Sequence, residues 1–277
     1  MNDDNGKQSF WEHLDVLRAI LMKVSIVTVS FGIMAFLLKE EVFTIVLAPK
    51  NADFITYKVI DLLGSKISDS TLSYFSVQLI NTGLAEQFII HMKTAMCVGV
   101  LGASPYIIYQ LFRFVSPALY AEEKKYAVRV VAGAYIMFLL GVLLTYYMIF
   151  PLTFRFLSTY QVNDDVTNLI SISSYISTLL VMSLCMGIVF EIPVLSWLFA
   201  KMGFISASFM QHYRKHAIVI ILIVAAIITP TSDIFTLSLV ALPMTILYEL
   251  SIFIIRDNEC VSSCRTIKAL DMKAKEI

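Results

Sequence analysis

The chain has 277 residues, of which 58% are hydrophobic and 15% charged, and its mean hydropathy is +0.78. Lys and Arg number 21, as do Asp and Glu, so the formal net charge is zero. This composition excludes an ordinary water-soluble domain, and the balanced charge gives no reason to expect a nucleic-acid partner. The expected solvent is the lipid bilayer, which a helix of about 20 apolar residues can cross.

The first predicted element precedes the first span. Ser9 and Glu12 stand three residues apart, a capping-box pattern that starts helices. Residues 8–18 would form an amphipathic element along the cytoplasmic membrane surface, with Glu12, Asp15 and Arg18 toward water. The alternative is a plain extension of the first span, and the pattern alone favours neither.

Six apolar segments have the composition of membrane spans. Five approach 20 residues: Ala19–Leu38, Thr94–Phe112, Val128–Phe150, Leu179–Phe199 and Phe235–Ile255. The sixth, Ala217–Thr229, has only 13 residues, and a helix of that length covers about 20 Å of a core about 30 Å thick. Polar clusters on both sides favour a short span over a re-entrant segment. The sequence thus predicts an all-α, polytopic membrane protein with six transmembrane helices.

Residues 39–87 separate the first two spans and form the predicted outer region. Its apolar, β-branched pieces, Val42–Leu47 and Leu72–Ile80, indicate an ordered segment. Pro49 predicts a bend there.

The first inner loop, residues 113–127, contains a helix start at Ser116-Pro117, with Pro at its favoured first position. Glu122 and Glu123 fall in the early turns of that helix. They either stabilise it through the helix dipole and nearby lysines, or form a carboxylate pair for a cationic ligand.

Glu191 interrupts the apolar segment Leu179–Phe199 near its middle. An acid at the centre of a span costs roughly 3 kcal/mol on insertion scales, so such residues usually face a bundle interior or a wet cavity and mark function. Pro193 follows two residues later and predicts a kink beside the carboxylate. A kink that serves packing alone is the competing explanation. Pro105 and Pro243 predict kinks in two other spans.

The last span begins after Thr229-Pro230-Thr231-Ser232, where Asp233 is the predicted N-cap. Residues 1–256 then form a single transmembrane domain, and 257–277 a flexible, polar cytoplasmic tail.

Cations predict the orientation, because Lys and Arg in short loops stay on the cytoplasmic side. With the N-terminus inside, fourteen of the 21 Lys and Arg fall in inner segments and five in outer ones. An even number of spans puts both termini in the cytoplasm, and the start of the chain lacks the features of a cleaved signal.

The sequence shows no catalytic, cofactor or metal motif. The histidines form no HExxH pair, and GxSxG and GxxxxGK[ST] motifs are absent. The four cysteines, Cys97, Cys185, Cys260 and Cys264, are expected to be reduced thiols. We therefore expect neither an enzyme nor a bound cofactor.

Taken in order, several motifs resemble the TatC family, the multi-span core of the twin-arginine protein translocase. They are Glu12-His13-Leu14-Asp15-Val16-Leu17-Arg18, Phe114 through Glu123, Phe190-Glu191-Ile192-Pro193, Thr229-Pro230 with Asp233, Ala241-Leu242-Pro243 and Leu247-Tyr248-Glu249. Each motif is weak alone, but their order and spacing are specific and cover nearly the whole chain.

The resemblance implies a cytoplasmic-membrane receptor with six helices in a concave, glove-like arrangement, which binds twin-arginine signal peptides of folded precursors. It implies a signal-peptide site made of Glu122, Glu123, Glu12, Asp15, Arg18, Phe114, Leu119 and Tyr120, with Glu123 as the main arginine ligand. It also implies an intramembrane cavity at Glu191, Phe190 and Pro193, structural or outer-side roles for Pro49, Pro230 and Asp233, and partners of TatA and TatB type besides further copies of the chain. Val16 departs from the family, which commonly has an acid there.

A proton-coupled carrier of small molecules, with Glu191 as the titrating group, is the alternative that the residues leave open.

Overall fold

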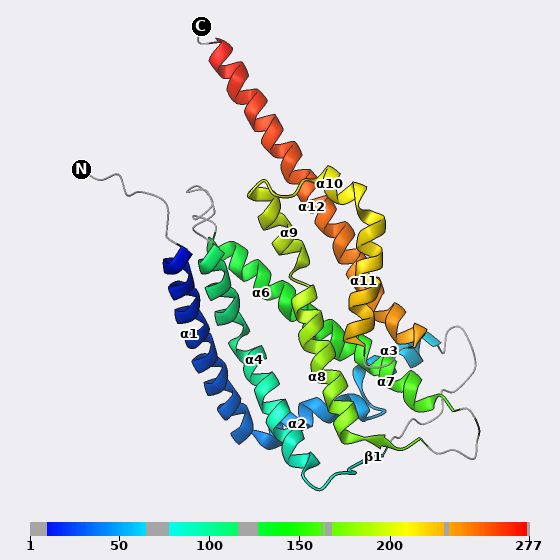
Figure 1. Ribbon diagram of the computed structural model, residues 1–277. Coiled ribbons are helices and arrows are strands. Elements are labelled where there is room, and N and C mark those ends of the chain that lie inside the picture. Colours follow the sequence, from blue (N-terminus) through cyan, green and yellow to red (C-terminus); the bar gives the residue numbers. More distant parts are fainter. Residues whose placement is uncertain are drawn as a thin grey trace. The chain divides into compact units, whose positions relative to one another are not determined.

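The computed structural model describes residues 10–64, 78–115, 127–161, 163, 168–229 and 233–275, and most of them are helical (Figure 1). Five segments of the described chain are long and apolar enough to cross a membrane: Leu14–Leu37, Glu86–Phe114, Val130–Thr159, Ile172–Lys201 and Ile234–Arg256. These coincide with the five full-length spans predicted from the sequence, so the prediction of a helical membrane protein is confirmed.

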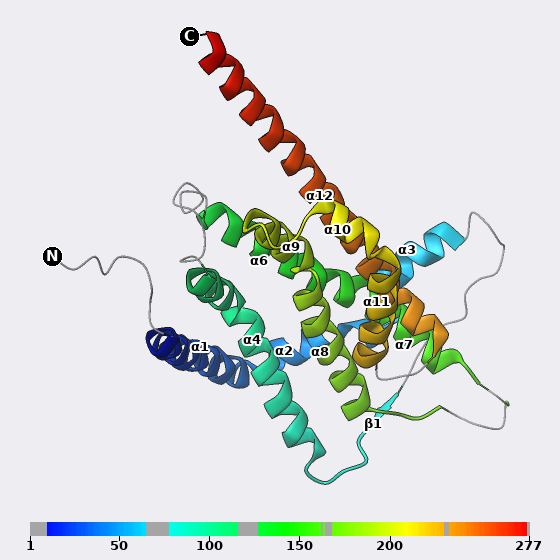
Figure 2. The same cartoon turned by 45° about the horizontal axis from the view of Figure 1, so that its top comes forward.

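The chain divides into two compact units, the first made of Met1–Phe54, Ser73–Tyr135 and Thr167–Leu180. Its main feature is the helix pair α1 (Phe10–Leu37) and α4 (Glu86–Val115), which lie side by side in both views (Figure 1, Figure 2). A Cβ built on Gly99 would meet the backbone of Gly32 at 2.7 Å and that of Thr28 at 2.8 Å. Glycine at position 99 therefore lets the two helix backbones touch.

Beyond this crossing, a histidine joins the two helices. The ring of His91 on α4 stacks on Phe36 of α1 at a centroid distance of 4.0 Å, and its Nε2 lies 3.2 Å from the Phe36 carbonyl oxygen. Helix α2 (Lys39–Leu47) follows, and Phe43 adds an edge contact to the same ring. The pair is thus secured at this end by polar and aromatic contacts.

Two short parallel strands, β1 (Leu79–Ile80) and β2 (Ile170–Ser171), order the loops of this unit. The carboxylate of Glu86 accepts hydrogen bonds from the Thr82 and Gly83 amides, at 3.0 and 2.9 Å, and from the Ser171 hydroxyl at 3.1 Å. One side chain thus both caps α4 and holds β2 near it.

The short helix η1 (Ala48–Lys50) contains the buried Pro49 in its first turn, at the bend that the sequence predicts. Just before it, the Val46 carbonyl accepts a hydrogen bond from the Tyr175 hydroxyl on α8 (Ile172–Val189) at 3.2 Å. The described part of the outer region is therefore ordered, as expected. Residues 65–77 lie outside the described chain, and with them most of the predicted segment Leu72–Ile80.

The second unit consists of Ile55–Leu72, Ile136–Val166 and Val181–Ile277. Its helices are α3 (Ile55–Gly64), the second part of α6 (Ala127–Leu144), α7 (Phe150–Thr159), the end of α8, α9 (Ile192–Lys201), α10 (Ala207–His212), α11 (Arg214–Ile228) and α12 (Ile234–Lys275). A five-residue π-helical turn, η3 (Thr145–Ile149), joins α6 to α7.

Helix α3 packs on that π turn. The buried Tyr57 hydroxyl donates to the Pro151 carbonyl at 3.2 Å, and the Thr56 hydroxyl donates to the Tyr147 carbonyl. Arg155 lies over the Tyr57 ring, 5.6 Å from its centroid. Burial raises the pKa of the Tyr57 phenol and the Arg155 cation lowers it, with burial the larger effect, so Tyr57 stays a neutral donor.

Two segments differ from simple expectations. Helix α1 runs without interruption from Phe10 to Leu37, so residues 10–18 extend the first span, and no turn separates them from it. Ser9 of the predicted capping box lies outside the described residues. At the other end, α12 continues as a helix through residues 257–275, where a loose tail was expected (Figure 1).

Candidate functional site

Three described residues of the predicted signal-peptide set belong to the α1–α4 pair: Asp15 and Arg18 on α1 and Phe114 on α4. The contacts Phe36–His91, Gly32–Gly99 and Phe31–Gly102 show that the helices run in opposite directions. The start of α1, with Asp15 and Arg18, therefore lies at the same end of the pair as the last turn of α4, which contains Phe114. The N-terminal element therefore ends beside the start of the first inner loop.

The described side chains at this end suit a site open to solvent. Asp15 and Arg18 are exposed, and Phe114 is half-buried. Leu119, Tyr120, Glu122 and Glu123 lie outside the described residues, as do Ser116 and Pro117, and the side chain of Glu12 is not described either. The structure therefore describes part of the predicted set, and the signal-peptide site itself stays a prediction.

Glu191 lies where the fourth span breaks. Helix α8 ends at Val189, a turn covers Phe190 and Glu191, and α9 begins at Ile192 with Pro193 in its first turn. Pro193 has no N–H to offer the carbonyl of Val189 four residues earlier, which accounts for the break. The Glu191 amide instead donates to the Ile188 carbonyl at 3.0 Å, in a tighter turn. The predicted kink beside the carboxylate is confirmed.

The carboxylate itself has unused bonding capacity. Glu191 is half-buried, and its Oε1 atom is fully buried without a hydrogen-bond partner among the described residues. A buried polar atom left unpaired costs roughly 1–3 kcal/mol, which makes it a strong acceptor for any donor that reaches it. Proteins usually satisfy such atoms, so an unpaired one marks a candidate binding position.

Close packing of α6 holds the break in place. A Cβ on Gly141 would meet the Met186 carbonyl at 2.7 Å and the Phe190 Cβ at 2.9 Å, so only glycine allows this approach. One turn later, the Thr145 hydroxyl donates to the Gly141 carbonyl at 2.9 Å. Phe190 is buried by this packing. The sequence did not reveal Gly141, because nothing in its own segment distinguishes it from other glycines in spans.

Asp233 caps α12, as predicted: its Oδ1 accepts a hydrogen bond from the Thr236 amide at 2.7 Å. Pro230 lies outside the described residues. Helices α4 and α12 continue through Pro105 and Pro243. Cys97 is buried and Cys185 is half-buried. Within the described chain no group of three His, Cys, Asp or Glu lies close enough to hold a metal.

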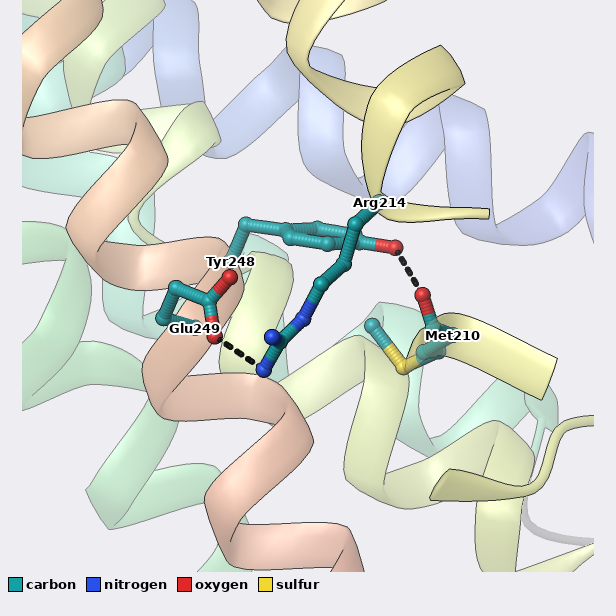
Figure 3. A network of polar contacts seen from close by, with 4 residues as sticks. All are labelled: Met210, Arg214, Tyr248 and Glu249. Atoms are coloured by element: carbon teal, nitrogen blue, oxygen red, sulfur yellow. Dashed lines mark hydrogen bonds and ion pairs between the residues drawn. The ribbon is translucent and has the colours of Figure 1, made fainter. Parts of the chain in front are cut away.

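A polar network at the junction of α10, α11 and α12 was not expected (Figure 3). Arg214 pairs with Glu249 at 2.7 Å, and the Tyr248 hydroxyl donates to the Met210 carbonyl at 2.9 Å. The partners are 35 and 38 residues apart, so no local spacing could reveal them. In the sequence, the only indication of this network was the Leu247-Tyr248-Glu249 motif, which contains two of its residues.

Comparison with known proteins agrees with this architecture. The family model described as "Sec-independent protein translocase protein (TatC)" matches residues 12–243. The TatC protein of Blattabacterium sp. subsp. Periplaneta americana is 34% identical over 92% of this chain and 97% of its own length. That of Koribacter versatilis is 33% identical over 88% of this chain and 83% of its own.

A solved structure titled "Crystal Structure of Twin Arginine Translocase Receptor- TatC" superposes on this fold. Its TM-score is 0.71 at 33% sequence identity, over 88% of this chain and 98% of the other. The family model and the superposition therefore agree, the first over residues 12–243 and the second over 88% of the chain. On these grounds the chain belongs to the TatC family of Sec-independent protein translocase proteins.

Proposed function

We propose that this chain is the signal-peptide receptor and core subunit of a twin-arginine translocase, which exports folded proteins across the cytoplasmic membrane. The observation that carries the proposal is the match of 88% of the chain to a structure named as the twin-arginine translocase receptor. The role is noncatalytic: it consists of recognising a signal peptide and holding it in the membrane.

First contact takes place at the cytoplasmic end of α1 and α4. Glu122 and Glu123 of the inner loop, with Glu12 and Asp15 of the N-terminal element, bind the consecutive arginines, and Glu123 is the main ligand. A guanidinium is a planar fork that a carboxylate accepts with two parallel hydrogen bonds, and it stays charged at physiological pH. The antiparallel run of α1 and α4, which puts the start of α1 at the same end of the pair as the last turn of α4, supports this grouping. Arg18, Phe114, Leu119 and Tyr120 shape the site.

A second contact is made within the membrane at Glu191, Phe190 and Pro193. A polar group on an inserted signal peptide, or on a single-span partner helix, would otherwise be unpaired in lipid. The Oε1 atom of Glu191 is buried at the helix break without a hydrogen-bond partner in the described part of the chain, which supports a role as the acceptor for that group.

The proposed topology has six spans with both termini in the cytoplasm, in a concave, glove-like arrangement. The sixth span is α11, whose 15 residues rise only about 22 Å, so the bilayer beside it thins or neighbouring helices shield it. TatA- and TatB-type single-span proteins and further copies of the chain are the proposed partners, with α11 and α12 as the docking helices for the single-span proteins.

Site-specific crosslinking of twin-arginine precursors to membranes that contain the chain tests the receptor role. Glu123→Ala should abolish most of the crosslinked product, whereas Glu40→Ala, which removes an exposed acid at the start of α2, should not. Undiminished crosslinking to the Glu123 variant would exclude this carboxylate as the arginine ligand. Export of a folded reporter in a strain that lacks its own translocase tests the function as a whole.

A further inference from the structure

An exposed cluster of aromatic and basic side chains lies where α10 meets α11. We call it the basic-aromatic patch and define it as Phe209, His212, Tyr213, Lys215 and His216. Tyr213 is its centre: ring centroids of Phe209, His212 and His216 lie 4.6, 5.1 and 5.6 Å from the Tyr213 ring. All five side chains are exposed, Phe209 at 53% and Tyr213 at 43%. Three rings thus surround one tyrosine without being buried by the protein.

The patch carries positive charge that the described chain does not neutralise. The adjacent Arg214 already pairs with Glu249 (Figure 3). Asp233 caps α12 at the opposite end of the α11–α12 hairpin. Lys215 has no ion pair with any described acid. The dipole of α11 does not explain these residues, because cations in the first turn of a helix are unfavourable.

The surface beside the patch is apolar. Immediately after His216, α11 exposes a set of aliphatic side chains: Ile218, Val219, Ile220, Leu222, Ile223 and Ile227. In a membrane protein such a surface faces acyl chains, so the patch marks the level at which hydrocarbon gives way to headgroups. Amphipathic rings and cations collect at that level.

We propose that the basic-aromatic patch binds the phosphate headgroup of an anionic phospholipid, whose acyl chains lie along the exposed face of α11. One molecule with an anionic head and apolar tails matches both halves of this surface. An acidic soluble protein would match only the charged half, and the cationic arginines of a signal peptide would be repelled. The binding site lies outside the residues assigned to signal-peptide recognition. It shares α11 with the proposed docking of single-span partners, so it is tested on the chain reconstituted without those partners.

The experiment measures which lipid surrounds position 213. The full chain carries Tyr213→Trp as a reporter, with Trp11→Phe and Trp197→Phe to remove the native tryptophans, and is reconstituted in phosphatidylcholine vesicles. Quenching of the reporter is compared between brominated phosphatidylglycerol and brominated phosphatidylcholine. The attraction of one lysine for an anionic headgroup corresponds to about a fivefold preference for the anionic lipid over the neutral one. The quenching should therefore show that phosphatidylglycerol is preferred over phosphatidylcholine beside the reporter by about that factor.

Variants decide whether the patch causes the preference. Lys215→Gln should reduce it to near unity, and Lys215→Arg should restore it, since charge at this position is what matters. Lys39→Gln, which removes an exposed cation at the start of α2, should leave the fivefold preference intact. Raised salt should weaken it, because exposed charges are screened. Inorganic phosphate at millimolar concentration should not compete, because it lacks the acyl chains.

Three outcomes would overturn the proposal. They are equal quenching by the two lipids, a preference that survives Lys215→Gln, and displacement of the lipid by inorganic phosphate, which would reveal a site for a free anion. Elution of every variant at the wild-type position in size-exclusion chromatography ensures that a lost preference reflects lost binding and not unfolding.

Discussion

Replacement of Gly99 by alanine should weaken the α1–α4 pair, although alanine is the better helix former. The new Cβ would lie 2.7 Å from the Gly32 amide nitrogen, and 2.8 Å from both the Gly32 Cα and the Thr28 carbonyl oxygen. All three are backbone atoms, which cannot rotate away, so the helices must separate. Overpacking of this kind costs about 1–3 kcal/mol, and contact with fixed backbone points to the upper end of that range.

The gain in helix propensity opposes this cost but does not cancel it. Alanine favours a helix interior over glycine by about 0.8–1.0 kcal/mol. Gly99→Ala should therefore lose about 2 kcal/mol of stability, roughly a 30-fold change in the folded-to-unfolded ratio. Gly32→Ala is the matched control at the same crossing, because its Cβ would meet the nearest atom, the Ala95 carbonyl oxygen, at an ordinary 3.6 Å. That variant should be neutral or up to about 1 kcal/mol more stable.

Equilibrium unfolding in mixed micelles with increasing dodecyl sulfate, followed by tryptophan fluorescence, measures both changes. Gly133→Ala on α6 is a second control, since its Cβ would meet nothing within 4 Å. Equal loss of stability in the Gly99 and Gly32 variants would refute the reasoning, because it would show that the crossing geometry does not distinguish the two glycines.

The remaining predictions concern polar groups. Asp233→Ala should cost about 1 kcal/mol in the same unfolding assay, since it removes the bond to the Thr236 amide, and Asp233→Asn should recover most of the loss; no loss in the alanine variant would contradict the capping role. Arg214 and Glu249 should show a coupling of about 0.2–1 kcal/mol in a double-mutant cycle with Gln at both positions, because the pair is about half exposed, and the coupling should fall at high salt; additive effects would mean that the pair contributes nothing. Glu191→Ala should leave crosslinking of precursors at the membrane surface largely intact but reduce export at least about fivefold. That factor is the lower limit of the cost of leaving a buried polar group without its partner. Export at the wild-type rate would exclude the proposed intramembrane contact.

Much of the local structure could be predicted from particular residues. The apolar runs predicted six spans, and five of them appear among the described residues as helices long and apolar enough to cross a membrane. Such runs are informative because spanning helices must satisfy their own backbone and must be long enough to cross the core. Pro193 predicted the break beside Glu191, because its missing N–H acts within one turn. Asp233 predicted the N-cap of α12, because a capping hydrogen bond also joins residues within one turn. In the signal-peptide site, the motif named residues but gave no distances between them.

Contacts between distant segments depended on the tertiary structure. The sequence shows glycines at positions 32 and 99 alike, yet only the crossing of α1 and α4 determines which of them tolerates a Cβ. The same holds for Gly141 beneath Phe190 and for the Arg214–Glu249 pair, whose partners are brought together by packing.

The sequence by itself therefore determined the membrane class, the main spans, the family and the place of the intramembrane acid. These depend on composition and on interactions within a few residues. Only the tertiary structure decided that α1 is one continuous helix and that a basic-aromatic patch borders the apolar face of α11. It also decided that the Oε1 atom of Glu191 has no hydrogen-bond partner among the described residues. In lipid, apolar side chains gain little by leaving their solvent, so the choice of contacts between helices passes to close packing and polar pairs, which a linear pattern does not encode.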